Sequence, residues 1–103
     1  MDLRQLRYFL AIAEHGSILK ASQALHVAQP SISTHLRNLE EELGVVLFER
    51  SARGVVATSE GQELIRHARL ILKSADDARE SLRSRSDSPV GRVTFAIPTS
   101  LVT

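Results

Sequence analysis

Residues 17–44, SILKASQALHVAQPSISTHLRNLEEELG, decide the fold of this chain. They predict two helices joined by a turn at residues 26–28. Ser17 is a good N-cap for the first helix, and the second begins at Pro30, which needs no N–H donor there, and ends at Gly44. Apolar side chains recur at helical spacing in both helices, at Ile18, Ala21, Ala24 and Leu25 and at Ile32, Leu36, Leu39 and Leu43.

The second of these helices carries polar side chains outside its apolar stripe, near its N-terminal end. They are Gln29, Ser31, Ser33, Thr34 and Arg37. A helix that enters the major groove of DNA needs this arrangement, because short donors and acceptors meet the base edges while the buried stripe holds the helix from behind. Residues 17–44 therefore favour a helix-turn-helix.

The neighbouring segments predict a winged form of this motif. Apolar residues at helical spacing run from Leu3 to about His15, and Gly16 ends this first helix. After the motif, two β-like runs at residues 47–50 and 55–58 flank Ser51-Ala52-Arg53-Gly54, whose glycine favours a tight hairpin turn. We therefore predict a mainly α domain over residues 1–58, with three helices and a short β-hairpin wing.

A long helix is predicted from residue 59 to residue 84, and either Thr58 or Ser59 has the position of its cap. At 1.5 Å per residue it is about 39 Å long. Its apolar residues alternate at intervals of four and three, at Leu64, Ala68, Ile71, Ala75, Ala78 and Leu82. A single helix cannot bury such a seam, so we expect this segment to be a linker helix that pairs with a second copy.

Several motifs in this order resemble the N-terminal DNA-binding region of LysR-type transcriptional regulators. They are LHVAQPSIS, LRNLEEELG, LFERSARG and ATSEG, within residues 3–72. The resemblance implies a homodimer with antiparallel linker helices that binds double-stranded DNA at an interrupted palindrome. It also implies a longer bacterial regulator, in which residues 85–91 form a hinge and residues 92–103 start a truncated effector-binding domain. The intact protein would then be a tetramer that senses a small molecule, with RNA polymerase as a further candidate partner. No cofactor is implied for the fragment.

Each polar residue at the start of the second motif helix has a predicted role at DNA. Gln29 before Pro30 is expected to contact a base, because a glutamine side chain pairs with adenine N6 and N7. Ser31 and Ser33 are expected to donate to bases or phosphates. Thr34 and His35 depart from the family, many members of which carry Arg or Gln there, so base preference at that step stays open. Arg37 is assigned to a phosphate, with a salt bridge to Glu41 as the alternative.

Cationic side chains outside that helix extend the predicted DNA surface. Arg53 at the wing tip suits the minor groove, whose negative potential attracts guanidinium groups. Arg50 is expected either to contact DNA, like Arg53, or to anchor the wing to the domain. Lys20 is a candidate phosphate contact. The predicted DNA-binding set is Lys20, Gln29, Pro30, Ser31, Ser33, Thr34, Arg37, Arg50 and Arg53.

Composition limits the other classes of protein. At 103 residues the chain can form one small domain and an extension, and its formal net charge of +1 does not by itself indicate a nucleic-acid binder. Absence of cysteine excludes disulfides and thiolate metal sites and fits the bacterial cytoplasm, and no apolar run reaches the length of a membrane span. The three acids at residues 40–42 are expected to face away from a duplex.

The residues do not predict an enzyme or a metal site. The four histidines, at positions 15, 26, 35 and 67, lack metal-ligand spacing, and no Gly-rich phosphate loop or oxyanion-hole loop accompanies Ser31, Ser33 and His35. The main alternative is a dimerising adaptor whose residues 17–44 bind protein, and another winged-helix family is a third. Salt separates the first two, because DNA binding weakens steeply as salt rises and an apolar protein interface does not.

Overall fold

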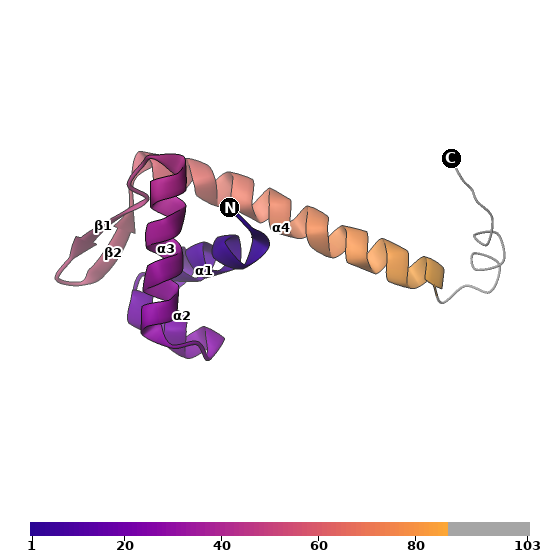
Figure 1. The fold of residues 1–103 in the computed structure, drawn as a ribbon, viewed down its shortest axis with the longest axis horizontal. Coiled ribbons are helices and arrows are strands. Elements are labelled where there is room, and N and C mark those ends of the chain that lie inside the picture. Colours follow the sequence, from indigo (N-terminus) through magenta and orange to yellow (C-terminus); the bar gives the residue numbers. More distant parts are fainter. Residues whose placement is uncertain (87–103) are drawn as a thin grey trace. The chain divides into compact units, whose positions relative to one another are not determined.

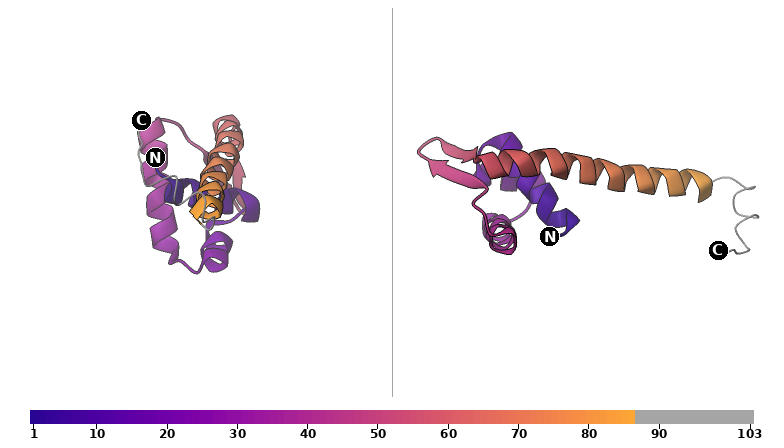
Figure 2. Two further views of the ribbon diagram at one scale, coloured as in Figure 1. Left: turned by 90° about the vertical axis from the view of Figure 1, so that its right-hand side faces the viewer. Right: turned by 90° about the horizontal axis from the view of Figure 1, so that it is seen from above.

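The fold, given by a computed structural model that describes residues 1–86, is mainly helical (Figure 1). Along the chain lie α1 (Leu3–His15), α2 (Ile18–Leu25), α3 (Gln29–Leu43), β1 (Phe48–Ser51), β2 (Gly54–Ala57) and α4 (Ser59–Ser86). The predicted order of three helices, a hairpin and a long helix is confirmed. Met1–Leu72 form one compact unit, in which α1 contacts both α2 and α3, and α2 contacts α3 (Figures 1 and 2).

Local signals fix the ends of the first three helices. Asp2 forms a capping box with Gln5, in which the Gln5 N–H donates to Asp2 Oδ1 over 2.8 Å and the Asp2 N–H donates to Gln5 Oε1 over 3.2 Å. Ser17 caps α2, as predicted, by accepting the Lys20 N–H over 3.2 Å. Gly44 ends α3 in the left-handed conformation that glycine tolerates best. These short-range contacts leave a turn at residues 26–28, where it was predicted.

The core joins all three helices to the base of the hairpin. Its largest fully buried side chains are Leu6, Phe9, Ile12, Ile32, Leu39 and Leu47. Phe9 packs on Phe48 with ring centroids 5.2 Å apart, which ties α1 to β1. Burial of each large apolar side chain contributes roughly 1.5–3 kcal/mol, so Ile32 and Leu39 hold α3 firmly from behind. Two predicted stripe positions differ: Ala24 is exposed, and Leu43, the last residue of α3, is 38% exposed.

Thr58, and not Ser59, caps α4. The Thr58 Oγ1 accepts the Gly61 N–H over 3.0 Å, and Ser59 is the first helical residue. The helix continues to Ser86, two residues beyond the predicted end at residue 84, so the first two residues of the expected hinge 85–91 are helical. The remainder of that hinge, and the expected start of a regulatory domain at 92–103, lie outside the described residues. Within residues 1–86, none of the helices is long and apolar enough to cross a membrane.

The first half of α4 packs on its own domain, which corrects one part of the predicted seam. Ala68 is completely buried in the core, and Leu64 is half-buried against it together with Ile65 and Leu72. The small side chain of Ala68 lets α4 lie close to the rest of the domain. Ala68 is therefore covered by its own domain and is not available to a second copy. The heptad pattern shows that a face is apolar but not which surface covers it. Ile71 and Leu82 remain 38% and 66% exposed.

Candidate DNA-binding surface

The N-terminal end of α3 presents the polar residues that were predicted to contact DNA. The helix starts at Gln29, one residue before the predicted start, and its N-cap Ala28 provides no side-chain hydrogen bond. The first N–H groups of a helix lack partners within the helix and carry partial positive charge. In α3, however, Pro30 carries no N–H and the Ser31 N–H donates to Ala28 O over 3.0 Å, so few donors of this turn are left for an external acceptor such as a phosphate oxygen.

Exposure follows the predicted division of α3 into two faces. Gln29, Pro30, Thr34 and Arg37 are exposed, and Ser31 and Ser33 are half-buried. Residues four apart on a helix share a face, so Gln29, Ser33 and Arg37 form an outward row. Ile32, Leu36 and Leu39 lie on the other side and are buried. The alternative predicted for Arg37 was a salt bridge to Glu41. It does not occur, because none of the ion pairs within residues 1–86 includes Glu41.

His35, one of the two residues that differ from those of many family members, packs against another side chain of the domain. Its ring meets the ring of Tyr8 edge to face, with centroids 5.1 Å apart and an angle of 77° between the planes. Its Nδ1 is buried without a hydrogen-bond partner. Edge-to-face aromatic pairs add about 0.5–1.5 kcal/mol beyond their burial, so His35 fastens α3 to α1. Thr34, the other departure, is exposed beside it.

The hairpin has the form expected of a wing. Its antiparallel register runs from Phe48 opposite Ala57 to Ser51 opposite Gly54, one residue away from the predicted strand runs at 47–50 and 55–58. Ala52 and Arg53 form the exposed tip. Arg50 is exposed in β1 and stands in no ion pair within residues 1–86, which speaks against an anchoring ion pair to the domain. Lys20 is exposed on α2.

Sequence reasoning missed the contacts that hold the base of the wing. Glu40 Oε2 accepts the Leu47 N–H over 2.8 Å, and Thr58 Oγ1 donates to Val46 O over 2.6 Å. The Thr58 N–H also donates to Leu47 O over 3.0 Å. Glu40 therefore has a structural task, whereas the sequence indicated only its negative charge. A possible signal was its position one turn before the helix-ending Gly44, from which a long side chain reaches the next loop.

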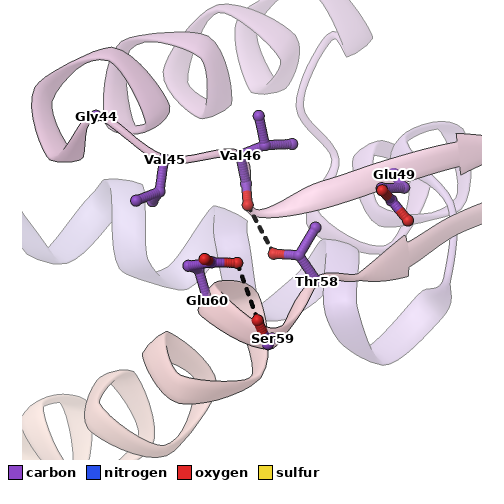
Figure 3. A pocket seen from close by; sticks show the side chains of 7 residues that line it. All are labelled: Gly44, Val45, Val46, Glu49, Thr58, Ser59 and Glu60. Carbon is purple, nitrogen blue, oxygen red and sulfur yellow. Dashed lines mark hydrogen bonds between the residues drawn. The ribbon is translucent and has the colours of Figure 1, made fainter.

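A shallow depression of about 520 Å³ lies beside this base (Figure 3). It is formed by the loop at residues 44–46 and the start of α4, with Glu49 and Glu60 in its lining. Carboxylates repel phosphate, so the depression is unsuited to the DNA backbone. Its polar contacts instead fix the loop between α3 and the wing.

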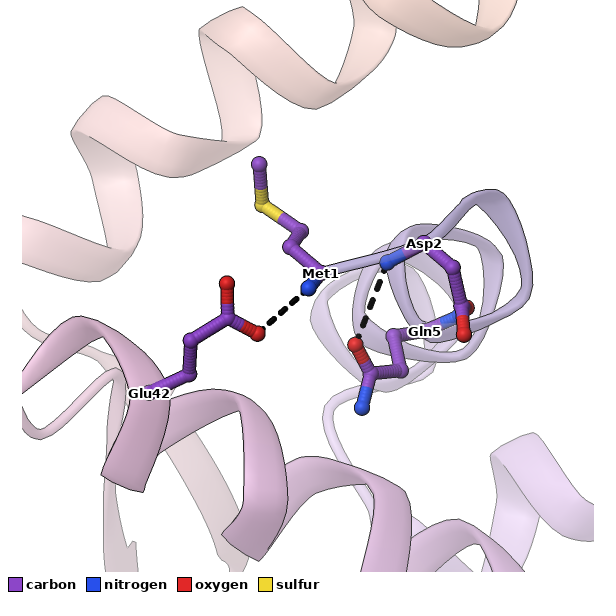
Figure 4. A network of polar contacts seen from close by, with 4 residues as sticks. All are labelled: Met1, Asp2, Gln5 and Glu42. Carbon is purple, nitrogen blue, oxygen red and sulfur yellow. Dashed lines mark hydrogen bonds and ion pairs between the residues drawn. The ribbon is translucent and has the colours of Figure 1, made fainter.

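The acidic end of α3 is also occupied by structural contacts. Glu42 pairs with the amino group of Met1, next to the Asp2–Gln5 capping box (Figure 4). The helix has 15 residues, so this end lies about 20 Å from Gln29 at 1.5 Å per residue. The negative charges at residues 40–42 thus lie toward the opposite end of α3 from Gln29, and that they face away from a duplex stays a prediction.

Comparison with known proteins identifies a family that this chain matches and several proteins of similar sequence or fold. Residues 3–62 match the family described as bacterial regulatory helix-turn-helix protein, lysR family. The transcriptional regulator ClcR of Pseudomonas putida is 43% identical over 96 residues, which cover 93% of this chain and 33% of ClcR. The chain thus spans about a third of the length of the curated relatives it matches.

Two solved structures of similar fold are DNA complexes. The DNA complex of the CbnR DNA-binding domain superposes with a TM-score of 0.80 at 43% identity, covering 84% of this chain and 99% of that one. The complex of the BenM DNA-binding domain with catB site 1 DNA gives a TM-score of 0.83 at 40% identity, covering 85% and 99%. Both share the three helices, the hairpin and the long helix described above. This chain belongs to the LysR family of bacterial helix-turn-helix transcriptional regulators.

Proposed function

We propose that this chain binds double-stranded DNA in a sequence-specific manner, with α3 in the major groove and the hairpin near the minor groove. The observation that carries the proposal is the outward polar row on α3, in which Gln29 and Arg37 are exposed and Ser33 is half-buried between them, while the opposite face of the helix is buried in the core. The CbnR and BenM structures of similar fold, which are complexes of DNA-binding domains with DNA, support it. Base contacts from such a row would give specificity.

Selection of bound sequences from random duplex DNA tests this proposal directly. We expect enrichment of two related half-sites at a fixed spacing, and binding to the enriched site that weakens steeply between 50 and 200 mM salt through counterion release. Enrichment of no sequence would contradict the proposal, and an absence of salt-dependent DNA binding would favour the alternative of a protein-binding adaptor. The selection also defines the DNA probe for the variants below.

The first prediction concerns Gln29 as a base-reading residue. Gln29→Ala should weaken binding to the selected site by about 1–3 kcal/mol and leave binding to random DNA nearly unchanged, because one bidentate base contact is lost. Competition titrations with both probes measure the two effects. Gln62→Ala, which removes another exposed glutamine on α4, should change neither. Equal losses on both probes for Gln29→Ala would show that Gln29 reads no base.

The second prediction concerns Arg53 at the wing tip. Arg53→Ala should weaken binding and lower the slope of log affinity against log salt by about one, because one phosphate-neutralising cation is removed. It should also reduce any preference for A·T pairs at the outer flank of each half-site, since narrow A-tract grooves attract guanidinium groups. Arg66→Ala, at an exposed arginine of α4, is the matched control. An unchanged slope together with an unchanged flank preference would exclude Arg53 from the interface.

The part of α4 from Ile71 onward supports a homodimer. Ile71, Ala75, Ala78 and Leu82 recur at helical spacing, and the two small residues permit close approach of a second helix. The charges favour antiparallel pairing, because Glu60 lies in the first turn and Arg83 and Arg85 in the last. Antiparallel helices bring opposite charges together, and parallel helices bring like charges together.

By family, the longer regulator would add an effector-binding domain that responds to a small molecule and would assemble as a tetramer of two such dimers. RNA polymerase is a further candidate partner, and a role at promoters would place the protein on the nucleoid in the cytoplasm. The LysR family consists of transcriptional regulators, and accordingly the function proposed for this chain is not enzymatic.

A further inference from the structure

The wing is attached to the helix-turn-helix by a direct contact between two backbones. The Val55 N–H in β2 donates to Gly16 O, in the turn between α1 and α2, over 3.0 Å. Gly54 beside it lies so close that a Cβ placed there would be 2.2 Å from the same oxygen. Its φ of +133° is also a conformation that other residues rarely adopt. Only glycine therefore permits this approach.

Gly16 links three elements through this contact. Its own N–H closes α1 by donating to Ile12 O over 2.8 Å, and the next residue, Ser17, caps α2. Its carbonyl oxygen can hardly move without opening the turn that joins the two helices. Because α2 packs on α3, the attachment point of the wing is fixed relative to the reading helix.

The tip of the wing adjoins this attachment point. Arg53 directly precedes Gly54, and its N–H donates to Ser51 Oγ over 3.3 Å, while the Ser51 hydroxyl donates to Gly54 O over 3.4 Å. These bonds make residues 51–54 one small unit, so displacement of Gly54 also displaces Arg53. The Gly54–Gly16 contact therefore fixes where the wing tip, with Arg53, lies relative to the rest of the domain.

We propose that Gly54 is a positioning residue that sets where Arg53 meets DNA, and so sets base preference at the outer flank of the half-site. The inference rests on the proposed DNA-binding function and adds a determinant of its specificity. Ordinary contacts with a Cβ begin at 3.4 Å, whereas a Cβ at Gly54 would lie 2.2 Å from Gly16 O. The wing would have to shift by about 1 Å, a displacement large enough to weaken a contact that depends on groove width.

The test is sequence selection with Gly54→Ala, followed by titrations on the wild-type selected duplex and on versions with changed core or flanking pairs. We expect the variant to lose the flank preference, with discrimination between A·T and G·C flanks falling roughly fivefold or more, and to keep the core mismatch penalties within about twofold. Gly44→Ala is the matched control, because Gly44 has a φ of +70° but an added Cβ there would meet no atom of a residue distant in the sequence within 4 Å. It should keep both preferences.

A double-mutant cycle separates a positioning role from a general loss of stability. If Gly54 acts through Arg53, then the double variant Arg53→Ala with Gly54→Ala should show the same flank preference as Arg53→Ala alone. If Gly54→Ala does not fold, as judged by circular dichroism, Val55→Pro replaces it in the same assays, since it removes the donor to Gly16 O and keeps Gly54.

A folded Gly54→Ala or Val55→Pro variant with wild-type flank preference overturns the inference and leaves the proposed function intact. A further loss of flank preference in the double variant, beyond that of Arg53→Ala, overturns it as well. If the wild-type chain selects no DNA sequence, the proposed function fails, and the inference fails with it.

Discussion

Ile71→Lys is expected to convert the proposed dimer into monomers and to weaken binding to the full palindrome by about 10²–10⁴-fold. Ile71 is 38% exposed at the point where α4 leaves its own core contacts, and it shares a face with Ala75 and Leu82. A lysine in a paired apolar seam would lose its hydration without gaining a partner. Separation of the two reading helices then removes the gain from binding two half-sites at once. Sedimentation equilibrium and binding titrations on the same sample measure both effects.

Leu70→Lys is the matched control for this prediction. Leu70 is 67% exposed and directly precedes Ile71, but neighbouring residues of a helix point in different directions. The control adds the same charge to the same turn and should leave the dimer intact. Binding of Ile71→Lys to an isolated half-site should be nearly unchanged, because the reading surface lies on α3. A dimeric Ile71→Lys, or equal losses on half-site and palindrome, would exclude this face of α4 as the interface.

The parts of the fold that could be predicted are those whose signals are local in sequence. Ser17 caps the start of α2 by a hydrogen bond to a near neighbour, and Gly44 ends α3 by its left-handed backbone conformation. The limits of α2 and α3 were therefore predicted to within one residue. Helical periodicity likewise predicted Ile32 and Leu39 as core residues, and both are fully buried. The outward polar row on α3 follows from the same periodicity, and its roles at DNA stay predictions.

The parts that could not be predicted depend on contacts between distant segments. Ala68 fits a dimer seam by spacing but is buried in its own domain, because periodicity gives a face and not its partner. Glu40 binds the Leu47 N–H across a loop, and the sequence showed only its charge. The bond from the Val55 N–H to Gly16 O likewise joins segments far apart in the sequence, and no local pattern predicted it.

Gly61→Ala is expected to destabilise the domain by about 1–3 kcal/mol, although the same change in an exposed helix stabilises by roughly 1 kcal/mol. Gly61 is buried in the first turn of α4. A Cβ there would lie 2.1 Å from Leu47 O and 3.3 Å from Ala57 Cβ. The backbone oxygen of Leu47 also accepts the Thr58 N–H, so it cannot withdraw without loosening the base of the wing. A melting temperature lower by roughly 4–8 °C for each kcal/mol would record the loss.

The sign of this change makes it informative about the fold. Helix propensity and chain entropy both favour alanine over glycine, so only the close approach of α4 to Leu47 can reverse the effect. Gln62, the residue after Gly61, is exposed. Gln62→Ala changes the helix propensity of the same turn without adding a contact, so the variant should be as stable as the wild-type chain or slightly more stable. Thermal and urea unfolding of both variants measure the difference. If Gly61→Ala is as stable as the wild-type chain, the tight junction between the wing base and α4 does not exist in solution.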